Sequence, residues 1–164
     1  MTLRRHVNSD ITNLDMLHQE YSWVPDRHTV RPREKTLNEK MLYFESMSLI
    51  YKTITDLIMH TVFNMDTYKN EQGLLVYKNS KTVSMHAFKP NMFPYDVSEG
   101  TNHYIMWYNM HDVHIIRPTD EVITRDISDS IRQITGHDDY DFIWYYNPKM
   151  SICSLHVQVF WVEK

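Results

Sequence analysis

Glycine and cysteine are scarce in this chain of 164 residues, which contains three glycines and one cysteine. A Gly-rich phosphate-binding loop needs several closely spaced glycines, so the sequence excludes that kind of nucleotide site. The single Cys153 can form no internal disulfide and fits a reducing compartment. No apolar run reaches 18 residues and no signal-peptide pattern is present, so we expect a soluble cytoplasmic protein without a membrane span.

A run of basic residues is also missing. The chain has 17 Lys and Arg against 21 Asp and Glu, a formal net charge of −4. Nucleic-acid binding requires a positive surface for the phosphates, so the charge argues against binding RNA through stacked Tyr and Trp side chains. The ten histidines are scattered, and neither an HExxH motif nor a cysteine pair accompanies them. We therefore predict no metal site and no cofactor.

The chain divides into two regions that differ in hydrophobic periodicity. Residues 1–35 show weak periodicity and two breaks at prolines, so they are interpreted as an arm or linker, with a partner-binding segment as the alternative. Residues 36–164 are predicted to form one domain. The segment Thr36–Asn64 is predicted to be one long helix, because Thr36 and Glu39 form a capping-box motif and apolar residues recur at helical spacing.

The rest of the domain alternates strands with one further helix. Short runs rich in β-branched and aromatic residues predict strands at 74–77, 82–88 and 103–108, and a strand–loop–strand unit within 141–164. Thr119 and Gly136 are typical start and stop signals of a helix over 119–135. This order predicts an α+β fold, with an antiparallel sheet of about five strands and both helices packed on it.

The last strand carries the residues of greatest chemical interest. Alternation places His156, Gln158 and Phe160 on one face, and Leu155, Val157, Val159 and Trp161 on the other. A buried imidazole beside a buried amide requires hydrogen-bond partners or a ligand. One interpretation is a core histidine bonded to its neighbours. The other is a nucleophile that attacks phosphorus, with Gln158 and Ser151 donating to the phosphate oxygens.

These residues resemble the histidine-triad superfamily of nucleotide hydrolases and transferases. Its members end a strand at an Asn, pass through a loop with Ser or Thr, and enter a strand that carries the triad. Here Asn147 ends the strand, Ser151 lies in the loop, and Ser154-Leu155-His156-Val157-Gln158 takes the place of the triad. Gln158 at the third position is similar to the nucleotidyl-transferase branch, which includes galactose-1-phosphate uridylyltransferase and dinucleoside-polyphosphate phosphorylases.

The resemblance extends upstream and covers about residues 74–164. Asn91-Met-Phe-Pro94 looks like the loop that lines the family's nucleotide pocket, and the strand from His103 looks like an earlier family strand. The whole also resembles a group of uncharacterised fungal and large-virus proteins with an N-x-F-P-Y…H-V-x-V-F-W signature. If the chain is viral, the location implied is the host-cell cytoplasm or the virion.

The resemblance implies roles for ten residues. The catalytic candidates are His156, Gln158 and Ser154, and the substrate-binding candidates are Asn91, Phe93, Tyr95, His103, Asn147, Lys149 and Ser151. Two positions depart from the family pattern. Ser154 replaces the first histidine of the triad, and Pro148-Lys-Met150 replaces a Gly-rich loop, so that Lys149 could supply charge to a phosphate.

Two functions follow as expectations. The first is a nucleotide-phosphate hydrolase or nucleotidyl transferase, acting on a nucleoside phosphate or dinucleotide through nucleophilic His156. The second is a catalytically inactive binding protein of the same fold, which would contact a protein partner through the N-terminal arm. By analogy with the family, a homodimer is also expected.

Overall fold

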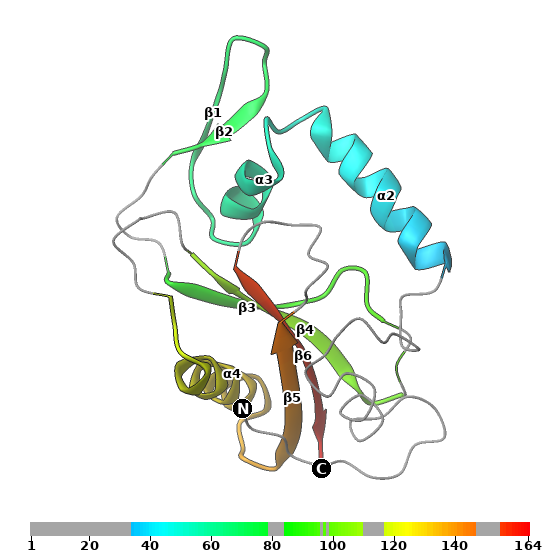
Figure 1. Ribbon diagram of the computed structural model, residues 1–164, viewed down its shortest axis with the longest axis vertical. Helices are drawn as coiled ribbons and strands as arrows, with labels where there is room; N and C mark the ends of the chain where they lie inside the picture. The colour runs from blue at the N-terminus through cyan, green and yellow to red at the C-terminus, as the bar shows by residue number, and fades with distance from the viewer. Residues whose placement is uncertain (1–33, 79–83, 96, 98, 110–116, 147–154) are drawn as a thin grey trace.

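The computed structural model describes residues 34–78, 84–95, 97, 99–109, 117–146 and 155–164. Within these residues the fold is α+β, with three helices and six strands arranged in two antiparallel sheets (Figure 1). The predicted fold class is thus confirmed at this level. Residues 1–33 of the predicted arm over 1–35 lie outside the described residues. None of the described helices combines the length and apolar character that a transmembrane span requires.

The main sheet has four strands in the order β3-β4-β6-β5. These are β3 (His86–Pro90), β4 (Asn102–Tyr108), β5 (Tyr140–Tyr146) and β6 (His156–Glu163). The prediction of about five strands in one sheet is wrong, because β1 (Thr67–Lys69) and β2 (Leu75–Tyr77) form a separate hairpin. The Asn70 side chain accepts backbone N–H bonds from Gln72 and Leu74 and closes that hairpin, as Asn commonly does in turns.

One face of the main sheet is covered by α4 (Asp120–Thr135), as predicted. Thr119 caps its start by accepting the Val122 N–H, and Gly136 ends it at φ 78°, a left-handed conformation that glycine adopts without steric cost. Ile123, Ile127 and Ile131 lie one turn apart on the buried stripe and are completely inaccessible to solvent. They pack on the β6 residues that alternation assigns to this face, including Val157, Val159 and Trp161.

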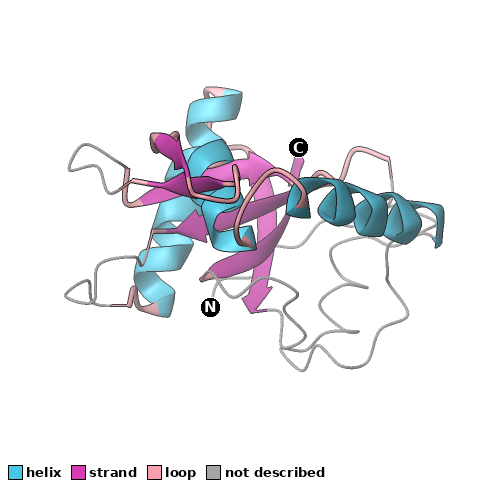
Figure 2. Cartoon of the chain, turned by 90° about the horizontal axis from the view of Figure 1, so that it is seen from above, coloured by secondary structure: helices cyan, strands magenta, loops and turns pink. Residues whose placement is uncertain are grey.

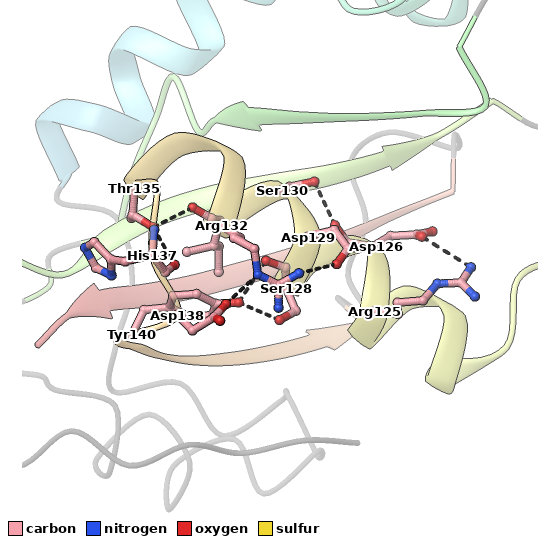
Figure 3. Close-up of polar contacts among 11 residues, drawn as sticks. Arg125, Asp126, Ser128, Asp129, Ser130, Arg132, Thr135, His137, Asp138 and Tyr140 are labelled. Atoms are coloured by element: carbon pink, nitrogen blue, oxygen red, sulfur yellow. Dashed lines mark hydrogen bonds and ion pairs between the residues drawn. The ribbon is translucent and has the colours of Figure 1, made fainter.

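Polar contacts join the C-terminal half of α4 to the start of β5 (Figure 3). Arg132 pairs with Asp129 at 3.0 Å and also with Asp138, beyond the helix end. The Tyr140 hydroxyl lies 2.6 Å from the Ser128 hydroxyl and donates to the Ser128 carbonyl oxygen. These contacts attach the end of α4 to the sheet. The helix covers one face of the sheet, and the opposite face is left to other elements.

The predicted single helix over Thr36–Asn64 is wrong. It is two helices, α2 (Glu34–Ser48) and α3 (Ile54–Thr61), and Thr36 lies inside α2 rather than at a cap. The capping box is instead formed by Thr53 and Asp56. The chain breaks here because Ile50 and Lys52 exchange backbone hydrogen bonds with Leu75, which attaches the segment to the β2 strand.

The helix α2 is also less buried than predicted. None of its residues is buried, and Met41 is 62% exposed. It lies on the side of the sheet opposite α4 (Figures 1 and 2). The helix α3 is the better packed of the two, since Leu57, Ile58 and Met59 are buried. Together, α2 and α3 approach the sheet face that α4 leaves open.

Candidate functional site

A cavity of about 450 Å³ lies over the sheet face opposite α4. Its floor is formed by two neighbouring strands: β4 contributes Ile105 and Trp107, and β6 contributes His156 and Gln158. In the strand register Ile105 lies opposite Gln158 and Trp107 lies opposite His156, so the four side chains form two adjacent rows on one face. The predicted placement of His156 and Gln158 on a common face is confirmed.

The walls come from elements on both sides of the floor. The α2 helix contributes Lys40, Tyr43 and Phe44, and α3 contributes Leu57, Ile58, Thr61 and Val62. The end of β3 and the segment after it contribute Lys89, Pro90, Asn91, Met92, Phe93 and Tyr95. The Phe93 ring lies 5.5 Å from the Tyr43 ring and 6.4 Å from the Phe44 ring, measured between centroids. This aromatic group joins the α2 wall to the β3–β4 segment.

His156 lies at one end of the cavity floor. Its side chain is buried, at 4% exposure, and lines the cavity. The imidazole packs against the Trp107 indole, with ring centroids 4.8 Å apart and planes tilted by 31°. An imidazole held against an aromatic ring at the edge of a cavity keeps a restricted orientation, which nucleophilic attack on a bound ligand requires.

His103 lies deeper than the cavity, behind Gln158. Its Nε2 is 2.5 Å from Gln158 Oε1, and its Nδ1 lies 3.1 Å from the backbone nitrogen of Tyr95. The ring stacks on Phe160 at 4.2 Å and meets the edge of Tyr95 at 4.9 Å. Burial lowers the pKa of His103 to about 4, although the hydrogen bond to Gln158 acts in the opposite direction.

Asn91 connects the segment after β3 to His103 and Gln158. Its Nδ2 donates to Gln158 Oε1 at 3.3 Å, its Oδ1 accepts the Phe93 N–H at 2.8 Å, and its backbone N–H donates to the His103 carbonyl oxygen. Asn91, Tyr95, His103 and Gln158 were all predicted site residues, and they form one continuous hydrogen-bonded network. His103, however, does not line the cavity.

The other predicted site residues are Asn147, Lys149, Ser151 and Ser154, and all four lie outside the described residues. Sequence reasoning missed Trp107 and Ile105, although alternation along 103–108 places both on the His103 face. It also missed Lys89, next to the predicted loop, and the α2 residues Lys40, Tyr43 and Phe44. Nothing local to α2 indicates that the helix turns these side chains toward the sheet.

The electrostatic character of the cavity differs from that of the chain. Two lysines line it, and no Asp or Glu does so among the described residues, whereas the chain as a whole has a net charge of −4. The described residues also contain no group of three or more His, Cys, Asp or Glu side chains able to hold a metal ion.

Comparisons with known proteins return no similar protein. No family model, no curated protein and no solved structure matches this chain.

Proposed function

We propose that the cavity binds a nucleoside phosphate and that His156 attacks its phosphorus, in a protein with a histidine-triad-like fold. The observation that carries the proposal is the charge of the cavity. In a chain with an excess of acidic residues, Lys40 of α2 and Lys89 of β3 both line the cavity, and no Asp or Glu among the described residues lines it. Such a lining favours an anionic ligand, because the positive charge of the two lysines attracts phosphate.

The remaining walls suit the base and the sugar. A volume of about 450 Å³ is within the range of small-molecule sites, and the lining is largely aromatic and aliphatic with few polar groups. Tyr43, Phe44 and Phe93 lie together over one side of the cavity, where a planar base can stack on them. Asn91 and Gln158 add amide groups between this aromatic side and His156.

The reaction divides into two displacements. An unprotonated nitrogen of His156 donates its lone pair to the phosphorus, an N–P bond forms, and the P–O bond to the leaving group breaks. The leaving oxygen takes a proton from solvent. Water, which gives up a proton to solvent, or a second phosphate then attacks the same phosphorus, the N–P bond breaks, and the imidazole is restored. The resemblance to the H-x-Q branch supports this order of steps, and Gln158, two residues from His156 on the same face, is placed to donate to a non-bridging oxygen.

Intact-mass analysis and calorimetry test the proposal. Wild-type protein is mixed with nucleoside mono-, di- and triphosphates and with dinucleoside polyphosphates. We expect binding with a Kd of ~100 μM or tighter, about 5.5 kcal/mol, and a nucleotidyl adduct that disappears in His156→Ala. His137→Ala is the matched control, because His137 is an exposed histidine at the far end of α4. No binding by any of these compounds would refute the proposal.

Charge reversal tests the role of the lysines. Lys89→Glu is expected to weaken nucleotide binding by about tenfold or more, because it replaces attraction with repulsion close to the phosphate. Lys69→Glu makes the same charge change on the exposed β1 strand, outside the cavity, and should leave binding within about twofold. Equal effects of the two substitutions would show that long-range charge, rather than contact in the cavity, governs affinity.

A catalytically inactive binding protein is the second candidate. Ser154 replaces the first histidine of the triad, and α2 exposes Leu37, Met41 and Leu42 to solvent as a protein-binding surface would. Nucleotide binding without any adduct, and without turnover of the bound compound, would favour this candidate over the enzyme.

A further inference from the structure

Two backbone N–H groups fix the orientation of the polar side chains behind the cavity. The Phe93 N–H points at one terminal atom of the Asn91 carboxamide, at 2.8 Å, so that atom must be the oxygen. The other terminal atom of Asn91 is then the nitrogen. It lies 3.3 Å from Gln158 Oε1 and acts there as a donor. The amide of Asn91 is thus assigned by a group that cannot itself rotate.

The Tyr95 N–H fixes the tautomer of His103 in the same way. It donates to Nδ1 of His103 at 3.1 Å, so Nδ1 carries the lone pair. In a neutral imidazole the proton must then be on Nε2, which lies 2.5 Å from Gln158 Oε1 and donates to it. The ring remains neutral because it is 6% exposed, stacked on Phe160 and in edge contact with Tyr95, with burial lowering its pKa to about 4.

Gln158 receives both of these donors on the same atom. Its carbonyl oxygen accepts from His103 and from Asn91, which uses both lone pairs. The amide nitrogen is therefore the terminal atom turned away from them. The described residues offer it no acceptor, and Gln158 lines the cavity. Its two N–H groups are consequently available to a ligand, beside the imidazole of His156.

We infer that His103 is a positioning residue whose Nε2–H tautomer turns the carboxamide of Gln158, so that Gln158 offers hydrogen-bond donors to the cavity and selects ligand groups that accept. With Lys40 and Lys89 on the walls, the groups selected are fully ionised phosphates rather than hydroxyl or amide donors. The inference rests on the proposed phosphate binding. The opposite tautomer would present the Gln158 carbonyl oxygen to the cavity, and that oxygen would repel a phosphate.

The tautomer can be observed directly. Long-range ¹H–¹⁵N NMR spectra of the full chain, labelled at histidine, should show His103 with a protonated Nε2 and an unprotonated Nδ1 throughout pH 5–8. Titration with pyrophosphate, which has acceptors and no base, should shift the side-chain NH₂ resonances of Gln158. A protonated Nδ1 in neutral His103, or Gln158 resonances that pyrophosphate leaves unmoved, would overturn the inference.

A pair of isosteric substitutions gives a second readout. In Gln158→Glu one carboxylate oxygen still accepts from His103 and Asn91, while the other brings negative charge to the cavity, so pyrophosphate affinity should fall by more than tenfold. Gln133→Glu makes the same change on the exposed surface of α4 and should leave the affinity within about twofold. Equal affinity of wild type and Gln158→Glu for pyrophosphate would also overturn the inference.

The experiments separate this inference from the proposed function. If pyrophosphate shifts Gln158 and Gln158→Glu abolishes binding, the inference holds even where nucleotides form no adduct on His156. If an adduct forms but Gln158→Glu neither slows its formation nor weakens pyrophosphate binding, the proposed function holds and the role of His103 is wrong.

Discussion

Acidification from pH 7 to pH 4.5 should destabilise the protein through His103. In the folded chain burial lowers the pKa of this residue to about 4, whereas an exposed histidine in the unfolded chain titrates near 6.5. Between these two values the unfolded state binds a proton that the folded state does not. The free energy of unfolding therefore falls as the pH decreases through this window, and the stabilisation is fully present above the unfolded pKa.

The size of the effect follows from the same two values. A difference of about 2.5 pKa units corresponds to about 3 kcal/mol when the whole window is crossed, and about 2 to 3 kcal/mol between pH 7 and pH 4.5. Solvent screens this effect little, because the ring is stacked on Phe160 and has 6% exposure. Among the described residues, no carboxylate or amine opposes the effect.

Urea denaturation of wild type and His103→Asn at both pH values isolates this contribution. Asn has a side-chain oxygen that can accept the Tyr95 N–H in place of Nδ1, and it does not titrate. The variant is expected to be less stable than wild type at pH 7, and to lose about 2 to 3 kcal/mol less than wild type on acidification. Other titrating groups contribute equally to both proteins and cancel in the difference. Parallel pH dependences for the two proteins would refute the assignment of a buried neutral imidazole.

Three further substitutions and one control substitution test the fold, with the free energy of unfolding as the measurement. Ile127→Ala should cost about 2 to 5 kcal/mol because the side chain is completely buried under the sheet, whereas Ile134→Ala, at 51% exposure on the same helix, should cost about 0.5 kcal/mol or less. Asp56→Ala should cost about 2 to 4 kcal/mol, because it removes the α3 cap and leaves the Tyr77 N–H without its acceptor. Gly136→Ala should cost about 1 kcal/mol, since φ is 78° there; an unchanged stability would contradict the left-handed cap.

The sequence predicts best where one local period decides the structure. Along β6 the period of two places His156 and Gln158 on one face and Val157 on the other, and the strand register confirms it. The α4 helix has an N-cap in Thr119 and a terminating Gly136, so both ends agree with local chemistry. In such segments the tertiary structure reinforces the local preference instead of opposing it.

The prediction of one long helix is wrong because of an interaction that local sequence patterns do not reveal. Thr36 with Glu39 and Thr53 with Asp56 are equivalent capping motifs, and the apolar spacing continues between them. The second motif is used because Asp56 also accepts the Tyr77 N–H, from a residue 21 positions later. The deciding interaction is tertiary, so the local pattern alone predicts one continuous helix and gives no reason to end it before Thr53.

The candidate site also has a part that local sequence predicts and a part that depends on tertiary contacts. Asn91, Tyr95 and Gln158 were predicted because they lie on the loop and strand that a family resemblance identifies, and the structure joins them. The α2 side of the cavity was not predicted, because Lys40 is brought to it by the break between α2 and α3. The floor of the cavity thus follows from strand periodicity, and its wall follows from a tertiary contact.

The two roles assigned to His103 respond differently to acid. When Nδ1 takes a proton, Nε2–H still donates to Gln158, so the amide keeps its orientation. The protonated Nδ1 instead faces the Tyr95 N–H, where two donors meet and the hydrogen bond is lost. We therefore expect acid to loosen the segment that carries Asn91 and Phe93, because the Tyr95 N–H attaches this segment to His103. The hydrogen bond between the Tyr95 N–H and Nδ1 of His103 therefore depends on pH, whereas the orientation inferred for the Gln158 carboxamide does not.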